Sequence, residues 1–210
     1  MTVALLPVKP FAVAKTRLAT VLTPTEREQL ARGLFRQMLA ALGSCPLVQR
    51  IVVVGPAEAQ VAGVGWQPDP GGGLNAALAA ALTAVAAEEA ALVVPTDLPL
   101  VTPEALAALL SRRLPGTRQV VVVPDRRGEG TNALVLQPPD VIAPAFGPAS
   151  LAAHLQAAQA AGARATVVTL PALALDLDHP ADLHALPAGV LAALLARGGA
   201  GEASTPALRR

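Results

Sequence analysis

Short, continuously apolar runs recur along this chain, and most of them are separated by stretches with helical periodicity. Strands that are apolar at every position, rather than at alternate ones, indicate a sheet covered on both faces by helices joined through right-handed crossovers. Two of the runs are separated only by a polar loop, so part of the sheet is expected to be antiparallel. We therefore predict a three-layer α/β/α sandwich with a mixed, mostly parallel sheet. Its strands are expected at residues 3–6, 48–54, 91–94, 120–123, 133–136 and 166–170.

Helix starts are signalled by side chains that cap free backbone amides. Thr23, Pro24 and Glu26 form the pattern of a capping box with proline in the first turn, and Gly43 marks the far end of the same helix. The same arrangement recurs at Thr102-Pro103-Glu104. Both sites predict helices that follow directly.

The length of 210 residues is enough for one full hydrophobic core. No internal repeat is visible, and we predict one domain over residues 1–196. From Arg197 onward the chain turns to Gly, Ala, Ser and Pro, so residues 197–210 are expected to form a flexible tail.

Composition excludes several classes of protein. The apolar content is 53% and the mean hydropathy is +0.50, but the longest smooth apolar run, residues 76–87, falls short of the roughly 20 residues that span a bilayer. The first residues do not follow the pattern of a signal peptide, so a cytoplasmic protein without a membrane partner is expected. A net charge of +1 and four aromatic residues argue against a nucleic-acid surface. A single cysteine, Cys45, excludes metal sites built from several thiolates.

A cationic loop follows the first predicted strand. Lys9, Lys15 and Arg17 lie in a segment stiffened by Pro7 and Pro10. The first 50 residues hold seven Lys or Arg but only two Glu, although the whole chain is nearly neutral. Ammonium and guanidinium groups both suit phosphates, so the loop is a candidate site for a small polyanion. A solvated loop whose charges only favour solubility is the alternative.

Candidate metal ligands follow two strands. Asp97 comes directly after the buried run 91–94, at the place where open α/β sheets bind ligands. A divalent cation bound to phosphate oxygens is a common partner for such a carboxylate, although Asp97 could instead bond its own turn. Asp176 and Asp178 share one side of an extended segment, so both could face the same ion. Asp182, three residues into a helix that Pro180 begins, is more simply a capping carboxylate.

Three glycine-containing turns could present free amides to a ligand. Gly73, Leu74 and Asn75 open an alanine-rich helix, and Asn75 could contact a base or ribose. Residues 128–132 and 146–150 have the same character, and the second turn leads into a helix that contains His154. A glycine-rich turn is more often only a turn, and a histidine such as His154 is more often a helix-face or core residue than a catalyst. No Walker A loop, Gly-x-Gly-x-x-Gly motif or Ser/His/Asp arrangement is present.

Taken together, these motifs resemble the 2-phospho-L-lactate and phosphoenolpyruvate guanylyltransferases of deazaflavin coenzyme (F-420) biosynthesis. The resemblance covers residues 6–183, in the family's order. It departs at Thr16, where serine is expected, and at Glu129, which interrupts the glycines before Thr131. The matching segments are Leu6-Pro-Val-Lys-Pro10, Ala14-Lys-Thr-Arg-Leu18, Gly73-Leu-Asn-Ala-Ala-Leu78, Pro95-Thr-Asp-Leu-Pro-Leu100, Gly130-Thr-Asn-Ala-Leu134, Phe146-Gly-Pro-Ala-Ser150 with His154, and Leu175-Asp-Leu-Asp-His-Pro-Ala-Asp-Leu183.

This resemblance implies a nucleotidyltransferase fold of the GT-A type and transfer of GMP from GTP to a small three-carbon phospho-acid, with release of pyrophosphate. Joining two anions requires charge neutralisation and alignment, so Lys15 and Arg17 are expected to be catalytic. The further roles that the resemblance implies are GTP binding by Lys9, Gly73, Leu74 and Asn75, acceptor binding by Thr131, Asn132, Gly147 and Ser150, and Mg²⁺ binding by Asp97, Asp176 and Asp178.

Two other functions remain open at this stage. One is a sister nucleotidyltransferase acting on a sugar phosphate or the molybdenum cofactor, although those families usually carry a Gly-rich loop where this chain has Pro7-Val-Lys-Pro10. The other is a catalytically silent nucleotide-binding module, which would be expected to lack a metal carboxylate. The sequence does not distinguish phosphoenolpyruvate, 2-phospho-L-lactate and 3-phosphoglycerate as acceptors. It also leaves the oligomeric state open, and a homo-oligomer is compatible with it.

Overall fold

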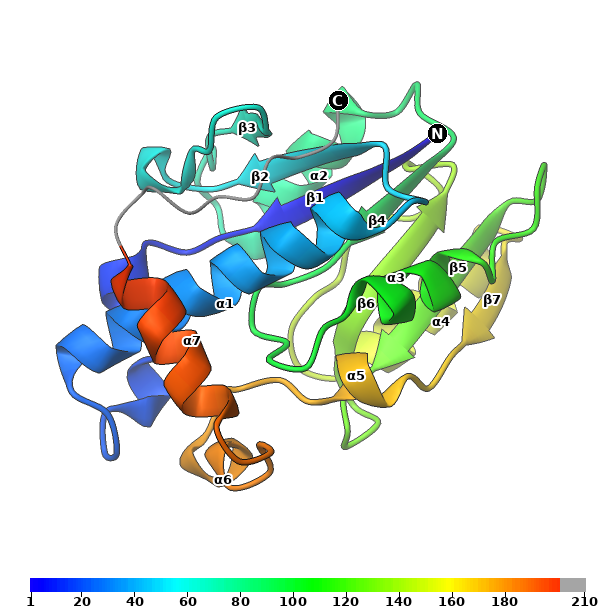
Figure 1. Ribbon diagram of the computed structural model, residues 1–210. Helices are drawn as coiled ribbons and strands as arrows, with labels where there is room; N and C mark the ends of the chain where they lie inside the picture. Colours follow the sequence, from blue (N-terminus) through cyan, green and yellow to red (C-terminus); the bar gives the residue numbers. More distant parts are fainter. Residues whose placement is uncertain (201–210) are drawn as a thin grey trace.

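A seven-stranded sheet forms the centre of the protein in a computed structural model that describes residues 1–200 (Figure 1). The strand order is β3-β2-β1-β4-β6-β5-β7. All paired strands are parallel except β6, which is antiparallel to both β4 and β5. The predicted mixed, mostly parallel sheet is therefore confirmed. The strands are β1 (Thr2–Pro7), β2 (Arg50–Val54), β3 (Gly65–Gln67), β4 (Ala90–Val93), β5 (Gln119–Pro124), β6 (Thr131–Gln137) and β7 (Arg164–Val167).

Each predicted strand differs from the observed one by one to three residues at one or both ends, and one strand is new. Strand β2 begins at Arg50 rather than at residue 48, and β7 ends at Val167, three residues before the predicted end. Leu170 precedes Pro171, which begins a short helix, and a residue before proline adopts an extended conformation without needing a strand partner. Strand β3 was not predicted, because three residues with a single large apolar side chain give no periodic signal.

Helices cover both faces of the sheet, as predicted for three layers (Figure 1). Neighbouring residues of β1 point to opposite sides: Ala4 and Leu6 join the core under α1 and α3, whereas Val3 and Leu5 join the core under α2 and α4. Within residues 1–200, no helix combines the length and apolar character needed to cross a membrane. The α-helices are α1 (Pro24–Ser44), α2 (Leu74–Ala84), α3 (Pro103–Leu110), α4 (Ser150–Ala160), α5 (Pro171–Ala174), α6 (Pro180–Leu183) and α7 (Val190–Gly199).

The predicted helix caps are present. The Thr23 hydroxyl accepts a hydrogen bond from the Glu26 amide, and the Glu26 carboxylate accepts one from the Thr23 amide, which completes the capping box of α1. Helix α1 continues one residue past Gly43. Thr102 caps α3 through the Ala105 amide at 3.1 Å. These two local signals therefore predicted the starts of α1 and α3 correctly.

Helix α7 crosses α1 at glycine contacts, which corrects the predicted boundary of the tail. A Cβ added to Gly198 would lie 1.7 Å from the Gln29 carbonyl oxygen, and one added to Gly33 would lie 2.0 Å from that of Leu194. Both glycines therefore allow a backbone approach that no other residue permits. Residues 197–199 belong to this packed helix rather than to a tail. Residues 201–210 of the predicted tail lie outside the described residues.

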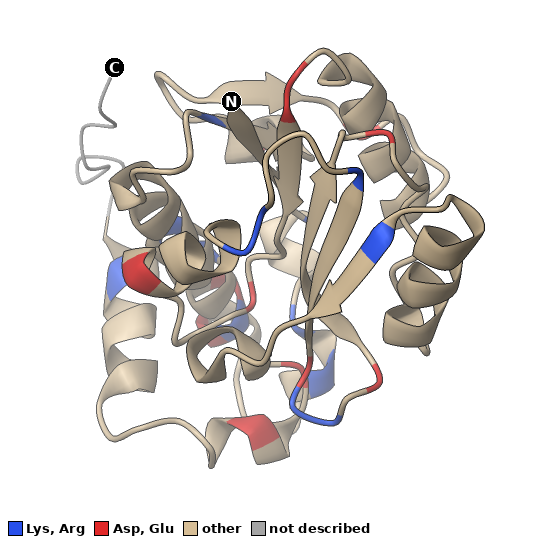
Figure 2. Ribbon diagram, turned by 90° about the vertical axis from the view of Figure 1, so that its right-hand side faces the viewer, with Lys and Arg blue, Asp and Glu red and all other residues tan. Residues whose placement is uncertain are grey.

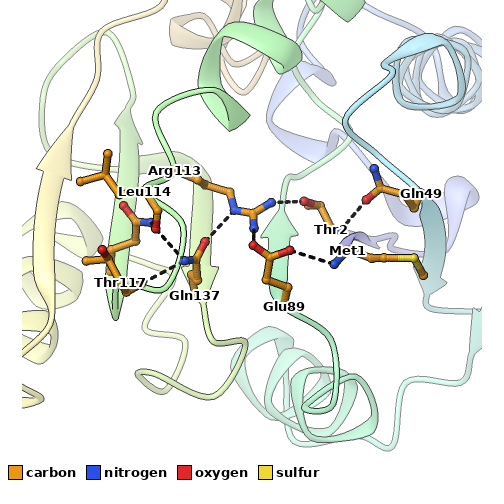
Figure 3. Close-up of polar contacts among 9 residues, drawn as sticks. Met1, Thr2, Gln49, Glu89, Arg113, Leu114, Thr117 and Gln137 are labelled. Atoms are coloured by element: carbon orange, nitrogen blue, oxygen red, sulfur yellow. Dashed lines mark hydrogen bonds and ion pairs between the residues drawn. The ribbon is translucent and has the colours of Figure 1, made fainter.

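Charged side chains are almost absent from the strands and lie in the surrounding loops and helices (Figure 2). At the edge where the parallel strands begin, Arg113 links three segments (Figure 3). Its Nε donates to Gln137 at 2.8 Å, its Nη2 pairs with Glu89 at 2.6 Å, and its Nη1 donates to the Thr2 hydroxyl. This network holds β1, β6 and the loop before β4 together, far from the edge where parallel strands end.

Replacing Arg113 with alanine is expected to destabilise the fold by about 2 kcal/mol, because the buried Gln137 loses a donor and Thr2 loses its partner. The kinetic constants of the folded variant should stay unchanged. Urea unfolding followed by circular dichroism measures the first effect. An unchanged unfolding midpoint would show that water replaces the guanidinium at no cost.

Candidate active site

The loop after β1 is fixed at both ends by buried side chains. Phe11 packs against Phe35 of α1 with the ring centres 5.6 Å apart, and its amide donates to the Glu58 carboxylate at 2.8 Å. Leu18, fully buried, joins a third, smaller core formed with α1 and α7. The residues between these anchors include the predicted catalytic pair, Lys15 and Arg17. The buried side chains of Phe11 and Leu18 thus hold the polar loop between them in place.

Lys15 lies between two carboxylates. Its Nζ is 3.0 Å from Asp97 Oδ2 and 3.2 Å from Asp178 Oδ1, and its side chain is only 9% exposed. The backbone of Lys15 is left-handed, with φ 54°, a conformation that costs energy for a residue with a side chain. Arg17 reaches the same acid through an ion pair of 3.2 Å with Asp178 Oδ2, but its side chain is 63% exposed. The two predicted catalytic cations therefore meet at one carboxylate.

The charges in this cluster shift one another's protonation. Burial alone would lower the pKa of Lys15, but Asp97 and Asp178 outweigh burial and hold that pKa above its ordinary value. Burial alone would raise the pKa of Asp178, yet Lys15 and Arg17 lower it. No cation among residues 1–200 offsets these effects at Asp176, where burial and then the negative charge of Asp97 raise the pKa. A cation added beside Asp176 would therefore stabilise its charged form.

Backbone contacts bring the two acidic segments together. The amide of Leu177 donates to the carbonyl of Asp97 at 3.0 Å, so Asp178 lies beside the turn that follows β4. Asp182 caps this segment by accepting from the amides of Asp178 and His179 at 2.9 and 2.6 Å. Its second oxygen accepts from Arg126 at 2.5 Å. The capping role predicted for Asp182 is therefore confirmed.

A cavity of about 520 Å³ opens at the end of the sheet where β1 and β4 finish. This volume lies within the range of small-molecule sites. Several predicted site residues line it together: Lys9, Lys15, Arg17, Gly73, Leu74, Asp97 and Asp178. A smaller cavity of about 380 Å³, lined in part by Trp66 and Pro56, shares Val8, Lys9 and Asp69 with the first.

Gly73 and Leu74 line the cavity, whereas the side chain of Asn75 hydrogen-bonds the backbone of Phe146. Gly73 has φ 89° and precedes α2 without a side-chain cap, so amides of the first turn are available to a ligand. The side chain of Asn75 donates to the Phe146 carbonyl at 2.9 Å and accepts from the Phe146 amide at 2.8 Å. Both of its polar atoms thus join the helix start to the turn 146–150. The predicted contact of Asn75 with a nucleoside stays a prediction.

The predicted acceptor residues gather around the start of β6 and the start of α4. The amide of Leu151 donates to the Glu129 carbonyl at 3.1 Å, which joins the two turns that contain them. Ser150 is buried, and its hydroxyl has no hydrogen-bond partner among residues 1–200, whereas Gly147 is exposed in the preceding turn. The Asn132 amide donates to the carbonyls of Leu173 and Ala174, both at 3.0 Å, so this side chain supports the backbone before Asp176.

Thr131 lies at the same edge of the sheet as Asp97. Because β6 is antiparallel to β4, the first residue of β6 lies where β4 ends, and Leu134 pairs with Val93. None of the four predicted acceptor residues lines the large cavity. The structure therefore places them next to the cationic cavity rather than in its wall.

No set of three or more His, Cys, Asp or Glu side chains surrounds a common point suited to a metal ion within residues 1–200. Asp97 and Asp178 enclose Lys15 Nζ instead, and Asp176 does not line the cavity. The donor type nevertheless fits Mg²⁺, which prefers carboxylate oxygens. Burial and then the negative charge of Asp97 raise the pKa of Asp176, and such an ion would neutralise that charge. Magnesium binding by Asp97, Asp176 and Asp178 stays a prediction.

Sequence reasoning missed Asp69 and Thr96 in the wall of the cavity and Arg126 beside the acidic segment. Asp69 lies between two prolines in front of three glycines, and its carboxylate accepts from the Gly71 amide at 2.8 Å. That turn signal was available in the sequence. Nothing local marks Arg126, because its partner, Asp182, is distant in sequence.

Comparison with known proteins identifies the chain's relatives. Residues 2–187 match the family model described as "Guanylyl transferase CofC like". The chain belongs to this CofC-like family. A phosphoenolpyruvate guanylyltransferase from Rubrobacter xylanophilus is 41% identical over 192 residues, covering 88% of this chain and 93% of the relative. Another from Conexibacter woesei is 41% identical over 194 residues, covering 88% and 86%. The resemblance inferred from the sequence is therefore confirmed.

Solved structures support the fold of this CofC-like protein. A putative nucleotide-diphospho-sugar transferase from Desulfovibrio desulfuricans G20 superposes with a TM-score of 0.74 at 16% identity, covering 94% of this chain and 97% of the other. A 4-diphosphocytidyl-2C-methyl-D-erythritol synthase gives a TM-score of 0.60 at 16% identity, covering 93% and 98%. At these identities the similarity concerns the fold, and it is the nucleotidyltransferase fold that the sequence predicted.

Proposed function

We propose that this CofC-like protein transfers GMP from GTP to phosphoenolpyruvate, with release of pyrophosphate, as a step in coenzyme F-420 biosynthesis. One observation carries the proposal: in a member of this family, a cavity of suitable size brings Lys15 and Arg17 together with Asp97 and Asp178. The names of the relatives specify phosphoenolpyruvate as their acceptor.

The reaction joins two anions. An oxygen of the acceptor phosphate attacks the α-phosphorus of GTP, the bond from that phosphorus to the bridging oxygen breaks, and pyrophosphate leaves with the electron pair. A phosphate oxygen is already ionised at neutral pH, so no general base is required. Catalysis then depends on holding the reacting groups in line and on neutralising charge that moves towards pyrophosphate.

Lys15 and Arg17 supply that neutralisation in this proposal. The Lys15 ammonium is buried and kept charged by its two carboxylates, so it presents a fixed positive charge at the cavity wall. Arg17 is mostly exposed and can turn its planar guanidinium towards phosphate oxygens. Lys9, also at the cavity wall, adds a third charge for the triphosphate. We assign the first two to catalysis and Lys9 to binding.

Asp97 and Asp178, with Asp176 next to them, would hold Mg²⁺. When bound, that ion would neutralise phosphate charge and orient the nucleotide. Gly73 and Leu74 line the same cavity. The free amides that begin α2 suit phosphate or ribose oxygens, and Leu74, 40% exposed, offers an apolar surface to the nucleoside. Thr131, Asn132, Gly147 and Ser150 surround the acceptor position next to the cavity, although Asn132 acts there through the backbone.

Pyrophosphate release tests the proposal. The purified protein is mixed with each nucleoside triphosphate in turn and with each of three acceptors, phosphoenolpyruvate, 2-phospho-L-lactate and 3-phosphoglycerate. We expect release with GTP and phosphoenolpyruvate to exceed every other pair. A requirement for a sugar phosphate, or release without any acceptor, would contradict the proposal.

Replacing Ser150 with alanine is expected to raise the KM for phosphoenolpyruvate about tenfold, the loss of roughly one hydrogen bond to a charged group. The dissociation constant for GTP, measured by calorimetry, should stay nearly the same. Ser111→Ala is a matched control, because that exposed hydroxyl bonds only its own helix at 2.8 Å. Weaker GTP binding with an unchanged acceptor KM would assign the turn 146–150 to the nucleotide.

A further inference from the structure

His154 is the most deeply enclosed titratable side chain next to the proposed acceptor site. It lies in α4 and is fully buried. Its Nδ1 is 3.0 Å from the Thr131 hydroxyl oxygen, and its Nε2 is 3.0 Å from the Ala145 amide nitrogen. The Phe146 ring packs edge-on against the imidazole with the centres 5.0 Å apart. The imidazole thus joins the start of β6 to the turn before α4.

These two contacts fix the hydrogen positions of the imidazole. A backbone amide can only donate, so Nε2 must accept and must carry no hydrogen. In the neutral ring the hydrogen then lies on Nδ1, which donates to Thr131 Oγ1. Burial lowers the pKa of His154 to about 4, so the ring is neutral at physiological pH. The tautomer is therefore set by the fold.

The tautomer in turn determines what Thr131 can do. Its hydroxyl oxygen accepts from His154, which directs the hydroxyl hydrogen away from the imidazole. No other residue among 1–200 hydrogen-bonds to that hydroxyl. Thr131 therefore has a donor available at the edge of the sheet that also carries Asp97. An anionic oxygen placed there would accept it.

The surrounding turn is held in the same way. Asn75 bonds both backbone groups of Phe146, at 2.8 and 2.9 Å, next to the Ala145 amide that contacts His154. Ser150 begins α4 one turn before His154, so helix, turn and strand share one set of bonds. The imidazole therefore cannot reorient without breaking contacts on both sides.

We propose that His154 is a positioning residue for acceptor binding: it orients the Thr131 hydroxyl so that its hydrogen points to the phosphate or carboxylate of the three-carbon acid. This inference rests on the proposed function, and it goes beyond it by assigning a role to a residue that touches no substrate. His154 contributes no proton to the reaction.

Two substitutions distinguish the hydrogen bond of His154 Nδ1 from that of its Nε2. In His154→Asn, the side-chain amide can take the place of Nδ1–H and donate to Thr131, whereas in His154→Gln it takes the place of Nε2 and bonds Ala145. We expect the Gln variant to raise the KM for phosphoenolpyruvate about tenfold and the Asn variant to change it less than about threefold. The KM for GTP should stay within about twofold in both.

Thr131→Val supplies the decisive comparison, because it removes the hydroxyl and keeps the shape of the side chain. In that background His154→Gln should have no further effect on the KM for phosphoenolpyruvate, since the two residues act as a unit. Arg113→Ala serves as a control for lost stability alone, because its network lies at the opposite edge of the sheet.

Equal effects of Asn and Gln at position 154, or full multiplication of the KM changes in the double variant, would overturn this role. His154 would then serve only to pack helix α4 against the sheet. Normal wild-type turnover with an unchanged Gln variant would overturn only this inference. An inactive wild-type protein with every acceptor would overturn both it and the proposed function.

Discussion

Asp97→Asn is expected to reduce turnover about a thousandfold or more while the fold stays intact, a loss of roughly 4 kcal/mol in transition-state stabilisation. The amide keeps the shape of the side chain but loses the charge that pairs with Lys15 at 3.0 Å and that is proposed to hold Mg²⁺. Single-turnover kinetics at saturating GTP and Mg²⁺ measure the loss. Thermal unfolding confirms that the variant is folded.

Asp140→Asn is the matched control, because Asp140 is exposed and lies in the loop after β6. It should leave turnover unchanged. Asp178→Asn should be harmful in the same direction but less severe, since Asp178 also pairs with the exposed Arg17 and is itself closer to solvent. Turnover of Asp97→Asn within threefold of the wild type would rule out the proposed metal role of this carboxylate.

The fold was predictable where the signals are local. Apolar runs mark six of the seven strands. The central strands β1, β4, β5 and β6 are buried on both faces and are therefore apolar at most positions, whereas β7 is mostly exposed and its boundaries were predicted least well. The capping box of α1 fixes the start of that helix, because it needs only residues three apart. Strand β3 has neither signal, and it is recognised only by its pairing with β2.

The glycines of α7 show why composition alone misplaced the start of the tail. A Gly- and Ala-rich stretch indicates flexibility when it is considered by itself. Gly198 is instead buried, because the Gln29 carbonyl of α1 takes the space of a Cβ. Close contact between helices and chain flexibility both favour glycine, and only the partner helix distinguishes them.

Some contacts of the candidate site were predictable from the sequence and others were not. That Lys15 and Asp97 would meet follows from topology, since the loops after neighbouring parallel strands lie at one edge of the sheet. That Lys15 would lie between Asp97 and Asp178 does not follow, because the second contact joins residues 163 positions apart. The same limit applies to Asn75, whose partner Phe146 is 71 positions away. Motifs locate such residues, and only tertiary contacts show what each polar atom bonds.

Lys15→Ala is expected to reduce the rate at saturating GTP about a hundredfold or more, the loss of a transition-state contact of roughly 3 kcal/mol. The Lys15 ammonium is the single buried cation between Asp97 and Asp178 in the described part of the chain. Removing it leaves two carboxylates facing each other across the cavity wall. Arg17→Ala should lower the same rate to a similar extent, because a charge next to the triphosphate is lost.

Each of the two cations has its own control variant. Lys15→Met keeps the length of the side chain without its charge, so it should reproduce the loss seen with alanine if charge is what matters. Arg112→Ala, an exposed arginine after α3, is the control for Arg17. A rise in the Michaelis constant for GTP with an unchanged maximal rate would make both residues ground-state binders. In that case the ion pairs with Asp97 and Asp178 would serve to hold the loop after β1 in place, and the transition state would depend on other groups in the cavity.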